Sequence, residues 1–265
     1  GNVGVNGANA SYVGEGGGDT VGNTGWIKGN VLLGDGSNAL TNSKWIDGDV
    51  LGGIGSDSVT NSAAAAEILG NVDLGGGTNK ISNSGHIASI VASGATGTDT
   101  VTNEASGVIE AAVNLGGTTV LNAVDTLTNK GVVEATAGVS YIGADTGDTV
   151  TNSGTLKGRV VLGNGTNVLS NTGAIGQNNL VAVLGGADKD TVTSSKAILG
   201  GINLGDGANA LTNSGAVGAD QDGVSYQGGG GVDTVVNSGT IIGGVHMGGG
   251  DDIFTNFSGK VHGTA

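Results

Sequence analysis

Asp148-Thr149-Val150-Thr151-Asn152-Ser153-Gly154 is one copy of a block that recurs along the whole 265-residue chain. Its Asn serves as an anchor for alignment, and eleven of the twelve anchor positions hold Asn, with Ser194 at the ninth. The shortest spacing between anchors is 19 residues, which indicates a minimal coil with insertions at its corners. The Asn anchors are Asn23, Asn42, Asn61, Asn83, Asn103, Asn129, Asn152, Asn171, Asn213, Asn237 and Asn256.

The residues before each anchor alternate in polarity. The residue two positions before is apolar in all twelve copies, and the residue between is usually Thr. This period of two is typical of a strand with one buried face. We therefore expect a ladder of Asn side chains along the stack, because stacked amides hydrogen-bond to one another.

Four positions before the anchor stands Asp or Asn in every copy, in nearly strict alternation. Equivalent residues in a parallel solenoid lie about 4.8 Å apart, so a column of carboxylates would repel. Interleaved Asn lowers the charge and offers each carboxylate an amide donor. The sequence thus predicts six copies of a two-coil unit of roughly 42 residues. The column residues are Asp19, Asn38, Asp57, Asn79, Asp99, Asp125, Asp148, Asn167, Asp190, Asn209, Asp233 and Asp252.

Two further apolar patterns complete the coil. Val-x-Leu-Gly, as in Val31 to Gly34, recurs before the even-numbered coils, and glycine-rich corners separate the apolar segments. The fold class predicted is an all-β parallel β-solenoid of about twelve three-strand coils, forming one domain over residues 1–265 with no evident caps. In the third unit the anchor is open between Asn122 and Asn129. The apolar column after the anchor is Ile27, Ile46, Ile68, Ile87, Ile109, Val132, Leu156, Ile175, Ile198, Val217, Ile241 and Val261.

Composition excludes several classes. The chain has 57 Gly, no Pro or Cys and only seven aromatic residues, so repetition rather than a layered core must organise it. A formal charge of −14 argues against binding to nucleic acid or to an anionic membrane surface. No apolar run approaches the roughly 20 residues of a membrane span, so we expect no membrane insertion by this segment.

The ends of the stack are the predicted assembly surfaces. A coil of this length cannot stand alone, because the entropy cost of ordering it exceeds what its few aliphatic side chains contribute. The chain starts before an odd coil and ends after an even one, so a second copy placed after the first would preserve the two-coil alternation. This favours copies of the chain stacked head to tail. The apolar residues expected at these ends are Val3, Val5, Tyr12, Phe254, Phe257 and Val261.

Other chemistry is weaker. Asp251 and Asp252 follow three glycines and are the best calcium candidates, although the nine-residue repeat of calcium-binding β-rolls is absent; no other cofactor is expected. Rows of Thr raise an ice-binding alternative, which Lys80 interrupts. No grouping of His, Lys and carboxylates suggests catalysis, so we expect no enzyme. Trp26 and Trp45 share one column and suit either sugar stacking or an interface.

Segments of the types Thr-Asn-Ser-Gly-Thr-Ile-x-Gly-x-Val and Leu-Gly-Asp-Gly-x-Asn resemble passenger repeats of bacterial autotransporters and large filamentous adhesins. The resemblance covers the whole chain at the level of the repeat, but the C-terminal membrane barrel of that family is missing. It implies a bacterial, extracellular or cell-surface protein, such as a biofilm component. We expect a structural subunit of a self-stacking filament; the alternative is a tethered adhesin stalk that binds a host or neighbouring cell surface.

Overall fold

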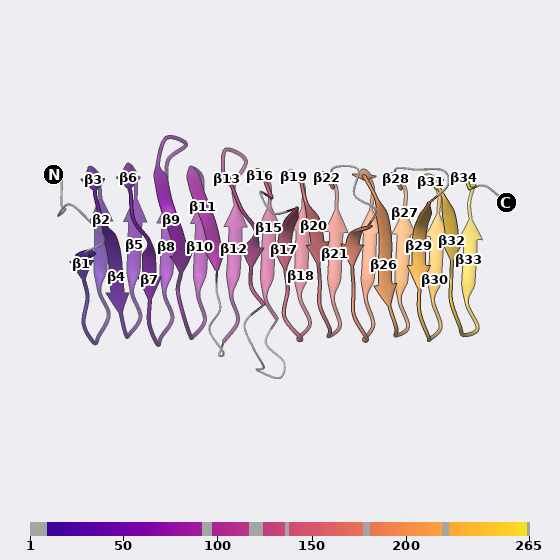
Figure 1. Cartoon of the computed structure of the whole chain (residues 1–265), viewed down its shortest axis with the longest axis horizontal. Coiled ribbons are helices and arrows are strands. Elements are labelled where there is room, and N and C mark those ends of the chain that lie inside the picture. The colour runs from indigo at the N-terminus through magenta and orange to yellow at the C-terminus, as the bar shows by residue number, and fades with distance from the viewer. Residues whose placement is uncertain are drawn as a thin grey trace.

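The chain forms a parallel β-solenoid of about twelve turns, which confirms the predicted fold class. The computed structural model describes residues 10–91, 97–116, 124–135, 138–176, 181–218 and 223–263. Within these ranges there are 34 strands and no helix. Successive coils lie side by side along one axis, with β1 at one end and β33 and β34 at the other (Figure 1).

The first strand of each coil ends at the anchor position, which is Asn in eleven coils and Ser194 in one, and the twelve such strands form one fully parallel sheet. Their pairing is in register throughout, so that Val150 lies between Leu127 and Leu169. The strands are β2 (Thr20–Asn23), β5 (Ala39–Asn42), β8 (Ser58–Asn61), β10 (Lys80–Asn83), β12 (Thr100–Asn103), β15 (Thr126–Asn129), β18 (Thr149–Asn152), β21 (Val168–Asn171), β24 (Thr191–Ser194), β27 (Ala210–Asn213), β30 (Thr234–Asn237) and β33 (Ile253–Asn256).

The second and third strands of the coils form the other walls. β9 (Glu67–Asp73) and β11 (His86–Val91) run through both positions and join them into one 22-stranded sheet. The remaining second strands are β3 (Trp26–Ile27), β6 (Trp45–Ile46), β13 (Val108–Ile109), β16 (Val132–Val133), β19 (Thr155–Leu156), β22 (Ala174–Ile175), β25 (Ala197–Ile198), β28 (Ala216–Val217), β31 (Thr240–Ile242) and β34 (Lys260–His262). The remaining third strands are β1 (Ala10–Val13), β4 (Asn30–Gly34), β7 (Val50–Gly52), β14 (Val113–Asn114), β17 (Val139–Ile142), β20 (Arg159–Val161), β23 (Val181–Leu184), β26 (Gly201–Gly205), β29 (Val224–Gly228) and β32 (Gly244–His246).

The register of the third unit is now defined. Asn129 pairs with Asn103 and Asn152, so it holds the anchor position, while Asn122 lies outside the described residues. One assignment in the apolar column was wrong. Val133, not Val132, pairs with the core residues of the adjacent coils and is fully buried. Both residues are apolar, so the pattern alone did not distinguish them.

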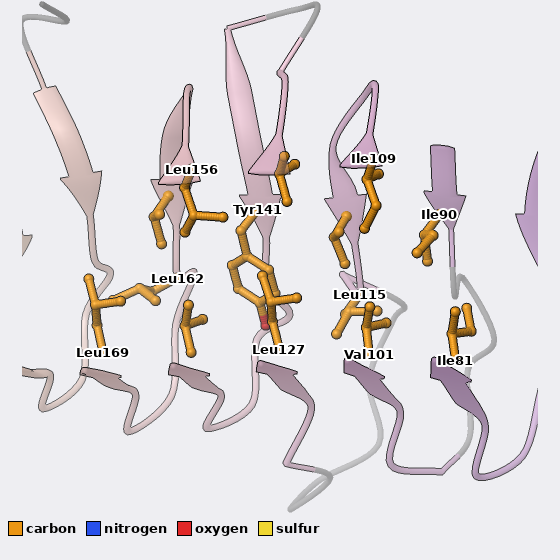
Figure 2. Close-up of a cluster of buried hydrophobic side chains, with 14 of the residues drawn as sticks. Ile81, Ile90, Val101, Ile109, Leu115, Leu127, Tyr141, Leu156, Leu162 and Leu169 are labelled. Carbon is orange, nitrogen blue, oxygen red and sulfur yellow. The ribbon is translucent and has the colours of Figure 1, made fainter. Parts of the chain in front are cut away.

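The core is a continuous column of aliphatic side chains inside the three walls. Figure 2 shows its middle part, where Leu169 on a first strand lies beside Leu162, and Leu127 on another first strand lies beside Tyr141. The ring of Tyr141 lies in the same interior and is fully buried. Burial of this column stabilises the stack as a whole, because each coil completes the core of its neighbours.

The two coils of a unit differ at one inner position. Val31 pairs with Val50 and Leu32 with Leu51, but Gly34 then pairs with Gly52. The register shifts by one residue because β4 contains an additional inward leucine, Leu33. The coil that lacks this leucine places an Asp carboxylate against its glycine instead, as described below. The two-coil repeat thus alternates an apolar and an acidic filling of the same region of the coil.

Candidate functional site

The Asn anchors point inward and form a hydrogen-bonded ladder. From Asn23 to Asn171, each Nδ2 donates to Oδ1 of the Asn in the next coil at 2.7–2.9 Å. The same amides also donate to corner carbonyls, as Asn42 does to Lys44. The Asn side chains therefore satisfy backbone carbonyl groups at these corners. Each such buried hydrogen bond stabilises the folded chain by about 0.5–1.5 kcal/mol.

Ser194 interrupts this ladder. Asn171 Nδ2 donates to the Ser194 hydroxyl at 3.1 Å. That hydroxyl donates its single proton to the Lys196 carbonyl of its own coil at 3.0 Å, so it donates no hydrogen bond to Asn213 in the next coil. The ladder resumes at Asn213, which donates to Asn237 at 2.8 Å, and Asn237 donates to Asn256 at 2.9 Å. Asn256 at the end donates to the Gly259 carbonyl of its own coil.

The Asp/Asn column forms a second ladder through the backbone. Except at Asp125, the N–H of a column residue donates to the side-chain Oδ1 of the next column residue, as from Asp57 to Asn79 at 2.9 Å and from Asn79 to Asp99 at 2.9 Å. In two coils the amide also reaches the carboxylate directly: Asn38 Nδ2 donates to Asp57 at 2.9 Å, and Asn167 Nδ2 to Asp190 at 2.8 Å. Asn in this column thus satisfies one oxygen of the neighbouring carboxylate.

In five odd coils, those of Asp19, Asp57, Asp148, Asp190 and Asp233, the carboxylate Oδ2 faces a glycine. A Cβ added to Gly143 would stand 2.0 Å from Asp148 Oδ2, and one on Gly185 would stand 2.0 Å from Asp190 Oδ2. Only a residue without a side chain fits there. Two of these buried oxygens, Asp57 Oδ2 and Asp233 Oδ2, have no hydrogen-bond partner, and at Asp148 it is the other oxygen, Oδ1, that has none.

Alternation fails in the middle of the chain, where Asp99, Asp125 and Asp148 follow one another in adjacent coils. Burial raises the pKa of Asp99 to about 6 and that of Asp148 to about 7, and the charge of Asp125 adds to both rises. Burial also raises the pKa of Asp125, against the N–H bond from Asp99. A buried carboxylate that shares its surroundings with others binds its proton more tightly.

The three tyrosines of the chain share one relation to this column that sequence reasoning missed. Each stands seven residues before an Asp: Tyr12 before Asp19, Tyr141 before Asp148, and Tyr226 before Asp233. Burial raises the pKa of each tyrosine, and its paired carboxylate adds to the rise. A Ser-Tyr dipeptide followed by Gly two residues after the Tyr was the available signal.

The C-terminal end of the stack exposes core positions. Phe254 and Val261 continue two buried columns, yet they are 43% and 41% exposed, and Phe257 beside them is exposed as well. Within the described chain, β33 pairs only with β30, and β34 only with β31. At the opposite end Val21 and Ile27 are buried. Tyr12 packs against the core, and Val3 and Val5 lie outside the described residues.

The remaining candidates are the calcium ligands Asp251 and Asp252 and the tryptophan pair. Asp251 is exposed on a corner and Asp252 is half-buried in the column. The described ranges contain no group of three or more His, Cys, Asp or Glu side chains arranged to hold a metal ion, and calcium binding stays a prediction. Trp26 and Trp45 lie next to each other on β3 and β6, exposed, with Lys28 Nζ 4.5 Å from the first ring centroid.

Comparison with known proteins adds no relative: no protein-family model, curated protein or solved structure matches the chain. Over the described residues, no helix is long and apolar enough to cross a membrane. The class that the fold defines is that of the parallel β-solenoid repeat proteins.

Proposed function

We propose that this protein is a structural, extracellular subunit whose solenoid ends stack on copies of itself to form a filament. The observation that carries the proposal is the exposed C-terminal end, where Phe254 and Val261 continue the buried columns. Exposed apolar core positions, bordered by strands that are paired on one side only, form a template for another chain.

The offset between the strand columns supports stacking of a second copy on this end. Among the described strands, the third-strand column begins with β1, one coil ahead of β2 and β3, and it ends with β32, one coil short of β33 and β34. In a head-to-tail stack, β1 of the next copy would therefore lie on β32 and complete the last coil. The Asn ladder supports the same order, because Nδ2 groups point along the chain direction from Asn23 toward Asn256.

Electron microscopy and sedimentation of the purified chain test this proposal. We expect filaments at micromolar concentration, and a stable monomer of about twelve coils, roughly 58 Å long at ~4.8 Å per coil, would contradict it. Phe254→Glu should abolish the filaments, because it places a charge in the joint. Val168→Glu is the matched control: Val168 is also an exposed apolar residue on the twelve-stranded sheet, and Lys80 occupies its column in another coil.

The alternative is a surface-anchored adhesin stalk, as in the passenger regions of bacterial autotransporters. The exposed pair Trp26 and Trp45 on the side of the stack favours it, because adjacent indoles suit binding of sugars or of a partner protein. This function predicts a monomer that binds a cell surface, with binding lost in the Trp45→Ala variant. The filament function predicts that Trp45→Ala polymerises like the unmodified chain.

A further inference from the structure

We infer that head-to-tail stacking is controlled by protons, because the joint assembles three successive column carboxylates, Asp233 and Asp252 of one copy and Asp19 of the next. The inference rests on the function proposed above. Asp252 stands at an even-coil position, where four of the other five coils hold Asn. Asp233 N–H donates to Asp252 Oδ1 at 2.9 Å, so Asp252 belongs to the same ladder as those Asn residues.

The interior of the chain contains an equivalent run of three successive column carboxylates in adjacent coils. Asp125 is the other even-coil Asp, and it lies between Asp99 and Asp148. Asp99 N–H donates to Asp125 Oδ1 at 2.7 Å, the counterpart of the bond from Asp233 to Asp252. The similarity extends to the tyrosines, since Tyr141 precedes Asp148 by seven residues and Tyr12 precedes Asp19 by seven. The run from Asp99 to Asp148 is therefore a template for the joint.

The internal run and the two ends of the stack differ in how deeply their carboxylates are buried. Asp125 and Asp148 are buried between their neighbouring coils, whereas Asp252 and Asp19 are each half-buried at an end of the stack. Stacking would place them in the environment of the internal run, where burial raises the pKa of Asp148 to about 7 and that of Asp99 to about 6. Burial in the joint would then favour the protonated form of these carboxylates.

The groups next to the joint column in the sequence are acidic or phenolic. On the first copy they are Asp251 beside Asp252 and Tyr226 before Asp233; on the next copy they are Glu15 and Tyr12. The basic side chains on the elements at the joint lie outside the Asp/Asn column: His246 on β32, Lys260 and His262 on β34, and Lys28 after β3 of the next copy. Because the column itself holds no basic residue at the joint, protonation of its carboxylates relieves the repulsion between them.

The direction of the effect follows from linkage. If the stacked state binds more protons, the association constant falls about tenfold per pH unit for each proton taken up. With the internal run as the template, this fall continues up to about pH 7 and ends above it. Filaments should therefore grow at pH 5 and dissociate at pH 8.

The test compares the association constants of three chains by sedimentation at pH 5 and pH 8. For the unmodified chain we expect a decrease of at least about 100-fold between the two, and for Asp252→Asn at most about tenfold. Asp206→Asn removes the same charge from an exposed corner, where Oδ1 accepts the Gly230 N–H at 2.8 Å, and it should behave like the unmodified chain.

Each other result has a defined meaning. Equal pH dependence in Asp252→Asn and the unmodified chain would overturn proton control while head-to-tail stacking stands. Assembly that ignores pH but requires added calcium would overturn it too. If no chain assembles at any pH, the stacking function itself is wrong.

Discussion

Asp148 Oδ2 occupies the space where a side chain on Gly143 would begin, with only 2.0 Å between that oxygen and an added Cβ. The same contact recurs at Gly185 and Asp190. The Ala144 N–H donates to Asp148 Oδ2 at 3.0 Å, so the carboxylate has little freedom to move away. A glycine five residues before the Asp is therefore part of the acidic filling of these coils.

Replacing this glycine should destabilise the fold. Gly143→Ala forces the new methyl group against Asp148 and against the Leu162 carbonyl, which would lie 2.5 Å away. We expect a loss of about 1–3 kcal/mol in the free energy of unfolding, measured by thermal denaturation followed by circular dichroism. Gly22→Ala is the control, because its Cβ would meet nothing within 4 Å. Equal losses in both variants would contradict the steric explanation.

Repairing the Asn ladder should stabilise the fold. Ser194→Asn places an amide between Asn171 and Asn213, so that Nδ2 can donate to Asn213 as in the other coils. We expect a gain of about 1 kcal/mol and a thermal midpoint about 2–4 °C higher. Ser195→Asn changes an adjacent exposed residue and should leave the midpoint where it is. A midpoint lowered by Ser194→Asn would mean that the column cannot accept Asn there.

The internal acidic run should make stability depend on pH. The folded-state pKa values of Asp99 and Asp148 are raised, to about 6 and about 7, so the folded chain binds more protons than the unfolded one. Stability from these groups is therefore full below about pH 4 and is lost as the pH rises through 6 to 7. We expect a lower thermal midpoint at pH 8 than at pH 5.

Asp125→Asn should reduce that difference, because it restores the alternation and removes one buried charge beside Asp99 and Asp148. We expect a gain of about 1–3 kcal/mol at pH 8 and a smaller gain at pH 5, measured by denaturation at both pH values. Asp206→Asn lowers the net charge equally at an exposed corner and serves as the control. A gain that is the same at both pH values would show that Asp125 is not part of a coupled acidic run.

The polar columns illustrate how far the sequence can be interpreted in a solenoid. Each residue contacts its equivalent one coil away, so the spacing of the repeat predicts which side chains meet. Asn152 and Asn171, one coil apart, are hydrogen-bonded as this spacing predicts. The alternation of Asp and Asn likewise predicts that Asn38 donates to Asp57, as it does. The tyrosine relation was missed because Tyr141 and Val160 fill equivalent core positions, and the sequence pattern treats both as apolar.

By itself, then, the sequence determined the parallel solenoid, the number of its coils and the alignment of its Asn anchors outside the third unit, because the repeated period leaves one consistent register there. The structure decided that Asn129 is the anchor of the third unit. Only the tertiary structure decided which of Val132 and Val133 is buried, since in a two-residue strand the neighbouring coils determine the inward position. It also decided that Asp148 shares its surroundings with Gly143 and Tyr141. Burial and protonation depend on what surrounds a carboxylate in three dimensions, and spacing along the chain does not contain that information.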